Sequence, residues 1–471
     1  MKPVRDNHAN EIASSAVDRR TFLRTSLAGT SLLAARCSDT AMNTLHLCPF
    51  RFDVTPPLGH SLCGGWIQPV VGVDDPLEAI GFVLLGLDKP IVICVVDWTG
   101  ILNAAHITWR QALAEAAGTT PERVALHSVH PHNAPFACLD AQEIVAQYPE
   151  LPPTLDLAFF QSCVERSQDA VRKALTQPRQ VTAVAHGQAR VEKVASNRRI
   201  LGPDGKVGTQ RGSSSRNPEH HRLPEGVIDP WLKTVAFYDN EKKVAACHYY
   251  ACHPMSYYGD GRVSADFCGL ARRQRQREEP DCLHLYFNGC GGNVGAGKYN
   301  DGSKPMRRVL TERMHQAMSR SEANLRPEPV ESIDWRTVPF LPEPHPRFDA
   351  GELAARIADP SRSVVQRNRP SFTLAYLRRF ARGDPIVVSS LQVNDIAMLH
   401  LPGECFVEYQ LRAQEMRPER FVATAAYGDD GPWYIPTKEA YPQGGYEVSV
   451  AWCDPKVDEL LTAAVRELLI S

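Results

Sequence analysis

Short apolar segments alternate with longer amphipathic ones along most of this chain, and this order leaves few fold classes open. Residues 79–87 and 91–97 have the apolar character of two strands, joined by the turn Asp88-Lys89-Pro90. Residues 108–117 and 157–175 carry apolar side chains at helical spacing. We expect further strands at residues 181–191, 234–238, 243–251, 283–287 and 386–401, and further helices at 404–416 and 455–469. The alternation predicts an α/β fold, and the hairpin-like pairs predict mixed β-sheets layered with helices in a single large domain.

The composition supports a sizeable buried core. Of the 471 residues, 43% are hydrophobic and 23% are charged, which excludes a disordered or fibrous chain. The formal net charge is −2, and the arginine-rich run at 272–277 fits the solvated face of a helix, so we expect no nucleic-acid partner. We expect residues 201–226, rich in Gly, Ser, Pro and charge, to form a surface excursion. Residues 322–385 are more polar and rich in Pro and Arg, and we expect them to be an insertion. The oligomeric state is not predicted.

The first 45 residues differ in character from the rest. Arg19-Arg20, then Phe22-Leu23 and a short run of small apolar residues, resemble a twin-arginine export signal. We therefore expect residues 1–45 to be signal and linker, residues 46–471 to be the folded domain, and the destination to be periplasmic or extracellular. Lipid anchoring at Cys37 is the less favoured alternative, because Arg36 stands where a lipobox needs a small residue. We expect most of the 13 cysteines, which include no C-x-x-C pair, to be buried small hydrophobes.

Two histidines follow a short apolar strand at residues 123–126. Side chains alternate along an extended segment, so His130 and His132 project from the same face. Two neutral imidazoles on one face suit a divalent metal ion, or a division of work between a ligand and a proton donor. The alternative is a polar loop with solvated histidines.

Four other places combine a reactive side chain with a strand end or a tight turn. His253 follows a strand and precedes a proline, and Glu404 follows a sharp turn in what we expect to be the first turn of a helix. Tyr434 lies in a loop between two prolines, and Arg198 follows Asn197 at a strand end. Each has an ordinary structural alternative: a hydrogen-bonded histidine, a carboxylate that complements a helix N-terminus, a packing tyrosine and an ion-paired arginine.

A glycine-rich run imitates a phosphate-binding loop. Residues 292–298 fit the pattern G-x-x-x-x-G-K, but Tyr299 stands where magnesium coordination needs Ser or Thr. A phosphate cradle also needs a helix N-terminus directly after the loop, and here a polar segment and Pro305 follow instead. We therefore interpret the run as a turn that lets the backbone approach a pocket closely, and not as a nucleotide site.

Taken together, these segments resemble the N-terminal catalytic domain of the neutral, non-lysosomal ceramidases and their bacterial relatives. The matches occur in one order between about residue 47 and about residue 453. Asp53-Val54-Thr55-Pro56-Pro57 is similar to that family's D-I-T-P-P motif, and His130-Pro131-His132-Asn133-Ala134-Pro135 is similar to its H-T-H-S-G-P motif. Asn197-Arg198 resembles its N-R motif, and Ala251-Cys252-His253-Pro254 resembles its strand that ends in a histidine. Pro402-Gly403-Glu404 matches its P-G-E motif, and Tyr434-Ile435-Pro436-Thr437 resembles its Y-[IV]-T-T motif.

The resemblance implies one zinc ion per chain. Its implied ligands are His130, His253, Glu404 and Tyr434. Nitrogen and oxygen donors of this kind suit zinc, which supplies activated water for the hydrolysis of an amide. His132 would then pass a proton to the leaving amine, and Arg198 would stabilise the charge that develops on the carbonyl oxygen. The residues expected to contact the substrate are Asn197, Asn293 and Gly295.

One departure from the family bears on the substrate. Relatives with ceramidase activity carry a serine where this chain has Gly295 and an aspartate where it has Asn293, so residue 295 cannot supply a hydroxyl. The sequence thus predicts an exported zinc-dependent amidohydrolase whose substrate is a small-molecule or lipid amide, with an N-acyl sphingoid lipid and contact with a membrane surface left open. The alternatives are a zinc hydrolase of another amide or ester, such as a carbohydrate or peptide derivative, and an exported binding protein that keeps the fold without the chemistry.

Overall fold

Three mixed β-sheets carry the fold in the computed structural model, which describes residues 44–470. Their strand orders are β6-β4-β3-β1-β8, β16-β14-β13-β9-β18 and β19-β20-β21-β23. Each sheet is antiparallel except for one parallel pair at an edge, which is β4–β6, β14–β16 or β21–β23. The predicted export signal at residues 1–45 lies outside the described residues, apart from its last two.

Most of the strands follow the expected segments, whereas β1, β18, β19 and β23 were not expected. Those of the first sheet are β1 (Leu45–Asp53), β3 (Glu78–Leu85), β4 (Ile91–Val96), β6 (Val124–Ser128) and β8 (Arg179–Val181). Those of the second are β9 (Ala183–Arg190), β13 (Trp231–Asp239), β14 (Lys242–Tyr250), β16 (Leu283–Asn288) and β18 (Glu328–Pro329). Those of the third are β19 (Ile333–Phe340), β20 (Ile386–Val393), β21 (Ile396–His400) and β23 (Phe421–Ala425).

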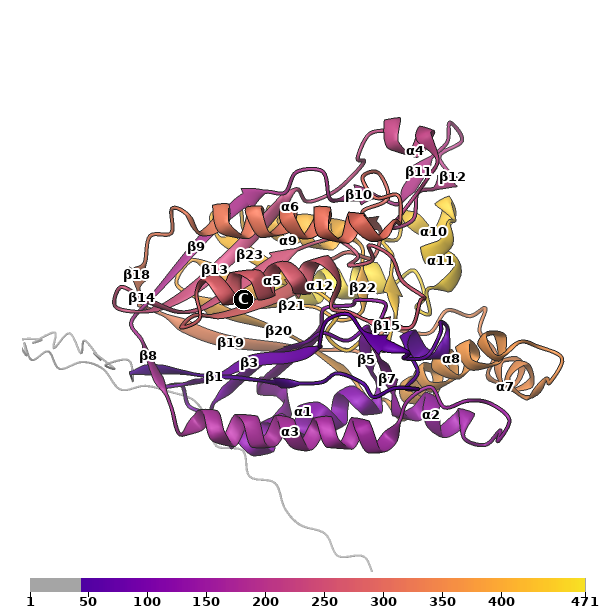
Figure 1. Cartoon of the computed structure of the whole chain (residues 1–471), viewed down its shortest axis with the longest axis horizontal. Helices are drawn as coiled ribbons and strands as arrows, with labels where there is room; N and C mark the ends of the chain where they lie inside the picture. Colours follow the sequence, from indigo (N-terminus) through magenta and orange to yellow (C-terminus); the bar gives the residue numbers. More distant parts are fainter. Residues whose placement is uncertain (1–43, 471) are drawn as a thin grey trace, which may run out of the picture. The chain divides into compact units, whose positions relative to one another are not determined.

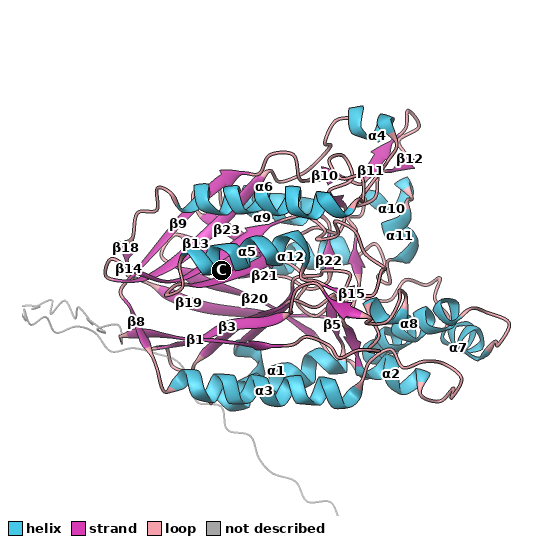
Figure 2. Ribbon diagram, in the orientation of Figure 1, coloured by secondary structure: helices cyan, strands magenta, loops and turns pink. Residues whose placement is uncertain are grey.

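Helices cover the outer faces of the sheets (Figures 1 and 2). The first sheet is covered by α1 (Ala104–Ala117) and α3 (Leu157–Leu175), and the second by α5 (Asp266–Glu278) and α6 (Lys304–Glu322). The third is covered by α9 (Val407–Met416) and α12 (Val457–Ile470). The structure therefore confirms the predicted α/β class, with mixed sheets layered with helices.

The central strands β3 and β4 of the first sheet are buried on both faces because each face packs against a different core. Phe82 of β3 and Ile93 of β4 face the core between the sheets, where the Phe82 ring centroid lies 5.7 Å from that of Phe237 in β13. Val83 and Cys94 point the other way, into the core beneath α1 and α3. This accounts for the continuous apolar sequence of these strands, because a strand that is buried on one face only alternates apolar with polar residues.

The segment expected to be an insertion, residues 322–385, contributes to the third sheet and to its core. Its strand β19 pairs with β20 along its length. It also contains α7 (Ala350–Ala358) and α8 (Val364–Arg382), which pack against each other. Helix α8 begins with a capping box between Ser363 and Gln366, and its residues Phe372 and Tyr376 are fully buried.

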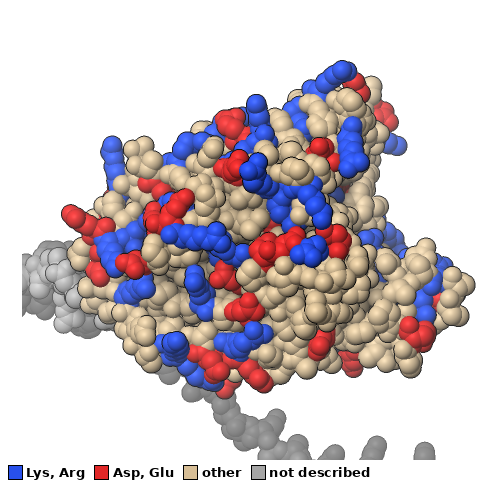
Figure 3. All heavy atoms as spheres, viewed as in Figure 1, with Lys and Arg blue, Asp and Glu red and all other residues tan. Residues whose placement is uncertain are grey.

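The surface and the cysteines fit an ordinary globular protein. On the face drawn in Figure 3, basic and acidic side chains are interspersed, in keeping with a formal net charge of −2. The twelve cysteines within residues 44–470 are all buried, and none of them forms a disulfide. Among the helices of that part of the chain, none combines the length and apolarity that a bilayer crossing requires.

A buried ion pair holds α8 against the loop that follows β23. Arg379 Nη1 lies 2.6 Å from Asp429 Oδ2, and both side chains are 1% exposed. Burial alone would raise the pKa of Asp429, but Arg379 and His106 hold it below its usual value. We expect Arg379→Ala to lower the free energy of unfolding by about 3–5 kcal/mol, because it leaves Asp429 buried and uncompensated.

Urea denaturation followed by circular dichroism measures this effect. Arg378→Ala, at an exposed position on the same helix, should change the unfolding free energy by less than about 0.5 kcal/mol. The double variant Arg379→Ala/Asp429→Asn removes the uncompensated charge and should recover part of the loss. Equal stability of Arg379→Ala and the wild type would contradict the structural role assigned to the pair.

Candidate metal centre

The four predicted ligands lie just beyond the carboxyl ends of strands that belong to the three parallel pairs. His130 follows β6, His253 follows β14, Glu404 follows β21 and Tyr434 follows β23. Carboxyl ends of parallel strands are where α/β proteins place their ligands. The topology therefore brings together four residues of which the first, His130, and the last, Tyr434, are more than three hundred positions apart in the sequence.

Backbone hydrogen bonds join the three edges at this point. The amide of Ser128, at the end of β6, donates to the carbonyl of Tyr427 after β23 at 2.7 Å. The amide of Ala426 donates to the carbonyl of Asn288, at the end of β16, at 2.9 Å. The loops that carry the ligands thus start from one connected framework.

The sequence suggested that Glu404 lies in the first turn of a helix, and this prediction is wrong, because Glu404 lies on a strand. It opens β22 (Glu404–Cys405), which pairs in parallel with β24 (Tyr434–Ile435) so that Glu404 stands opposite Tyr434. Helix α9 begins only at Val407. The turn before β22 requires Gly403, which has a φ of 55° and on which a Cβ would lie 2.5 Å from the carbonyl oxygen of Trp433. The carboxylate is therefore free of the helix-capping role that was its structural alternative.

Both candidate histidine ligands are oriented by a backbone carbonyl. His130 Nδ1 lies 2.5 Å from the carbonyl oxygen of Thr99, and His253 Nδ1 lies 2.8 Å from that of Gly291. A carbonyl can only accept a hydrogen bond, so each Nδ1 carries the proton and each Nε2 presents a lone pair. This is the arrangement in which histidines bind metal ions in proteins. His130 adopts a φ of 76°, which is uncommon for a residue with a Cβ and is enriched at functional sites.

The two lone pairs point at one carboxylate oxygen. Glu404 Oε2 lies 3.6 Å from His130 Nε2 and 3.1 Å from His253 Nε2, and all three side chains are buried. Burial lowers the pKa of His130 to about 4 and that of His253 to about 3, so both rings are neutral at pH 7. Three electron-pair donors that face one another without a proton between them repel, and a divalent cation removes the repulsion. The residues present therefore fit a metal ion.

A metal-free arrangement accounts for less of the geometry. Burial raises the pKa of Glu404, so a protonated Glu404 could donate to His253 Nε2. His130 Nε2 would then stay buried without a hydrogen-bond partner, as it is among residues 44–470. An unpaired buried acceptor costs about 1–3 kcal/mol. A metal ion satisfies both histidines and the carboxylate at once.

Tyr434 and Arg198 complete one side of the centre. The Tyr434 hydroxyl lies 3.5 Å from His253 Nε2 and accepts a hydrogen bond from Arg198 Nη1 at 3.3 Å. Arg198 Nη1 is also 3.5 Å from His253 Nε2, and its Nε lies 3.3 Å from Glu447 Oε1. Burial and Glu404 raise the pKa of Tyr434 well above 10, whereas Arg198 acts in the opposite direction. The arginine thus supplies a fixed positive charge beside the candidate ligands.

The centre lies in a cavity of about 450 Å³ that is lined by His130, His253, Glu404 and Tyr434. Its other walls include five aromatic side chains, Trp66, Phe136, Tyr258, Trp433 and Tyr446, beside polar groups such as those of Arg198 and Arg369. A concave site that combines aromatic walls with converging polar groups is typical of a small-molecule site.

Comparison with known proteins supports one fold assignment. No protein-family model matches the chain, and no curated protein matches it in sequence. Solved structures do match the chain in fold, among them the following two. A ceramidase complexed with C2 has a TM-score of 0.63 at 14% identity, covering 91% of this chain and 75% of that one. A neutral ceramidase from Pseudomonas aeruginosa has a TM-score of 0.62 at 16% identity, covering 91% of this chain and 74% of that one.

The chain has the fold of the neutral ceramidases. The predicted resemblance to these proteins is thereby confirmed for the fold.

On this ceramidase fold, His132 lies beside the candidate ligands. Its ring centroid is 5.0 Å from that of His130 and 5.7 Å from that of His253, and it lines the same cavity. Its Nε2 has no hydrogen-bond partner among residues 44–470, and its Nδ1 faces the Cys63 thiol at 3.8 Å. Because a ring nitrogen of each of the three histidines lies within 4.8 Å of the others, His132 is also close enough to be a third histidine ligand. The geometry thus leaves two roles open for His132, ligand and proton carrier.

The three residues expected to contact the substrate do not line this cavity. Asn197 donates from Nδ2 to the carbonyl of Val227 and accepts at Oδ1 from the amide of Arg199. Asn293 bonds to Glu408 Oε2 and to the amide of Val407 at the start of α9. Gly295 lies on β17 (Val294–Gly295), which pairs with β10 (Ser196–Asn197). Both asparagine side chains thus bind elements of the fold.

Sequence reasoning missed several residues of the cavity wall. Trp66 follows a short 3-10 turn, Trp433 precedes β24, Arg369 lies on α8 and Ser213 lies in the 201–226 excursion. Exposed loops that are long and polar often carry functional residues, and this was the available signal for Ser213. No pattern in the sequence pointed to Arg369.

Other polar clusters fit structural roles better. Lys298 of the glycine-rich run donates to the carbonyl of His221 at 2.6 Å, and no helix follows until Lys304, which agrees with the interpretation that this is not a phosphate loop. His248, His284 and Glu322 also lie together, but Arg275 and Lys243 already pair with Glu322. A metal ion there would compete with two cations.

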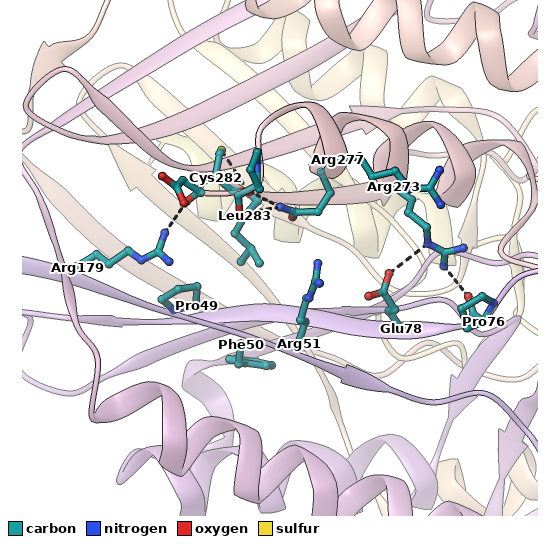
Figure 4. A pocket seen from close by; sticks show the side chains of 13 residues that line it. Pro49, Phe50, Arg51, Pro76, Glu78, Arg179, Arg273, Arg277, Cys282 and Leu283 are labelled. Carbon is teal, nitrogen blue, oxygen red and sulfur yellow. Dashed lines mark hydrogen bonds and ion pairs between the residues drawn. The ribbon is translucent and has the colours of Figure 1, made fainter.

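A second cavity, of about 690 Å³, shares no residue with the candidate metal centre (Figure 4). It is lined by Arg51, Arg179, Arg273 and Arg277. Arg273 pairs with Glu78, and Arg179 donates to the carbonyl of Asp281. No histidine among the described residues lines this cavity, so we place the chemistry at the first one.

Proposed function

We propose that this chain is a zinc-dependent hydrolase of amides that carry an apolar acyl group. The observation that supports it most is the convergence of His130 Nε2, His253 Nε2 and Glu404 Oε2 in a cavity of the ceramidase fold. Nitrogen and oxygen donors suit zinc, and Tyr434 stands as a fourth donor. A zinc ion held there would lower the pKa of water and polarise a carbonyl group.

Two residues of the chain would then handle charge and protons. Arg198, held by Glu447, is close enough to the centre to stabilise negative charge on the substrate carbonyl oxygen. His132 has a free Nε2 in the cavity and can pass a proton to the leaving amine. Burial lowers the pKa of His132 well below 6.5, so the ring is neutral at pH 7 and has to gain a proton before it can donate one.

The aromatic wall favours an apolar acyl group. The ring of Trp66 has its centroid 5.5 Å from those of Phe136 and Trp433, so these side chains form one continuous surface. An N-acyl lipid, including an N-acyl sphingoid lipid, fits such a surface, as do other N-acyl compounds. We also propose that the enzyme is exported, because residues 1–45 resemble a twin-arginine signal.

A substrate panel with and without metal tests this function. The protein is purified gently, its zinc content is measured, and it is assayed on an N-acyl sphingosine, an N-acyl amino acid and the matching esters. We expect amide hydrolysis that a chelator abolishes and added zinc restores. Hydrolysis that survives complete removal of metal would contradict the proposal. Stoichiometric metal without turnover of any amide or ester would favour the binding-protein alternative.

A cation at the edge of the cavity predicts a preference among amides. Arg369 of α8 lines the cavity and lies 4.6 Å from the centroid of the Trp66 ring, and it forms no ion pair with a carboxylate among residues 44–470. An acidic group on the substrate would give it a partner. We expect Arg369→Ala to raise KM about tenfold for an N-acyl amino acid, equivalent to about 1.4 kcal/mol, and to leave KM for a neutral amide within about twofold.

The matched control is Arg378→Ala, because this residue is exposed on the same helix and does not line the cavity. Steady-state kinetics on an acidic and a neutral substrate with the same acyl chain make the comparison. An equal change for both substrates would show that Arg369 acts on packing and not on substrate charge.

A further inference from the structure

Ser213 carries a hydroxyl that the fold leaves without a partner. The residue is 3% exposed, and its Oγ makes no hydrogen bond within residues 44–470. It lines the same cavity as His130, His253 and Glu404. A buried hydroxyl without a hydrogen bond costs free energy, and a ligand in the cavity would satisfy it.

The backbone around Ser213 is fixed to the rest of the centre. The amide of Arg211 donates to the carbonyl of Arg198 at 2.8 Å, and the amide of Ser215 donates to the carbonyl of Asn300 at 2.8 Å. The buried side chain of Asn300 donates to the carbonyl of Ser213 at 2.9 Å and to that of Ser256, just beyond His253, at 2.8 Å. The position of Ser213 is thus tied to Arg198 and to the loop of His253.

The glycine-rich run provides the space that Ser213 occupies. A Cβ at Gly297 would lie 2.5 Å from the carbonyl oxygen of Gly212, and a Cβ at Gly295 would lie 3.1 Å from Ser213 Oγ. Side chains at these two positions would displace the segment around Ser213. This is a physical reason for glycines that bind no phosphate: they let the backbone of the excursion reach the cavity.

We propose that Ser213 is a substrate-contacting residue of this centre and that its hydroxyl forms a hydrogen bond with the amide group that is cleaved. Gly295 has no hydroxyl, and in this chain Ser213 of the 201–226 excursion supplies one to the cavity instead. The assignment of an amide rests on the proposed function, whereas the contact with a ligand in the cavity rests on the placement of Ser213.

The first test asks whether residue 213 contacts a ligand in the cavity, and it does not depend on catalytic activity. The variant Ser213→Cys is loaded with zinc and treated with methyl methanethiosulfonate, and labelling is measured peptide by peptide, which separates the introduced thiol from Cys63 in the same cavity. We expect acetohydroxamate, a small chelating ligand for zinc, to slow labelling at least tenfold. Ser361→Cys, at an exposed position outside the cavity, should be labelled at the same rate with and without acetohydroxamate. Equal labelling of Ser213→Cys in both conditions would overturn the proposal.

The second test measures the contribution to the reaction. We expect Ser213→Ala to lower kcat/KM about 100-fold, as removal of one hydrogen-bond donor from a reaction centre does, with unchanged zinc content and unfolding midpoint. Ser213→Thr keeps a hydroxyl at this position, and a kcat/KM at least tenfold above that of Ser213→Ala would assign the loss to the hydroxyl. A kcat/KM for Ser213→Ala within twofold of the wild type would overturn the proposal. If the wild type cleaves no amide, the proposed function fails, and protection from labelling alone decides whether Ser213 contacts a ligand at the metal.

Discussion

In Glu404→Gln, we expect zinc binding and amide hydrolysis to be lost together. Glu404 is the carboxylate that lies between the two histidines, with its Oε2 3.6 Å from His130 Nε2 and 3.1 Å from His253 Nε2. The amide keeps the size of the side chain but removes its negative charge and can turn an NH₂ group toward the histidine lone pairs. Even residues that only orient metal ligands contribute about 10–100-fold to affinity, so the loss of a ligand should exceed about 100-fold.

Zinc titration with a competing chromophoric chelator measures the affinity, and circular dichroism confirms that the variant is folded. The control is Glu439→Gln, which changes the same functional groups at an exposed position near Tyr434 in the sequence. It should bind zinc as the wild type does. Glu404→Gln with wild-type zinc affinity would remove this carboxylate from the ligand set.

His132→Asn should separate metal binding from turnover. His132 lies beside the centre with a free Nε2 and faces the Cys63 thiol on its other side. Burial raises the pKa of Cys63 to about 12, so the thiol stays protonated and does not compete as a base. If His132 carries a proton to the leaving amine, its loss should lower kcat by about 10²–10⁴-fold and leave one zinc per chain.

His130→Asn provides the contrast, because the same substitution at the neighbouring candidate ligand should reduce both zinc content and kcat. Metal analysis and steady-state kinetics on the two variants give the comparison. The ring nitrogens of both histidines lie within 4.8 Å of His253, so distance alone does not distinguish their roles. Loss of zinc from His132→Asn would make His132 a ligand and contradict the division of roles between the two histidines.

The sequence predicted the strands better than the short elements between them. The strands β3, β4, β14 and β16 are long apolar runs, and their signal is local. The pairing of β22 with β24 is different, since it joins two-residue strands that lie far apart in the chain. The pattern after Gly403 resembled a helix start because α9 does begin nearby, at Val407. Only the tertiary pairing with Tyr434 shows why Glu404 faces the cavity.

That the four candidate ligands would lie together was predictable because each follows a recognisable strand or turn. His130 and His253 end apolar runs, and the order of the motifs linked them to Glu404 and Tyr434. The wall of the cavity was not predictable in the same way. Ser213 reaches it from an excursion through contacts with Arg198 and Asn300, which no local pattern encodes.

Anomalous diffraction at the zinc absorption edge, on crystals of the gently purified protein, tests the central claim most directly. Our account predicts one peak per chain, about 2.0–2.2 Å from His130 Nε2, His253 Nε2 and a Glu404 oxygen. A peak at His248, His284 and Glu322 instead, or a protein that binds no metal under these conditions, would contradict it.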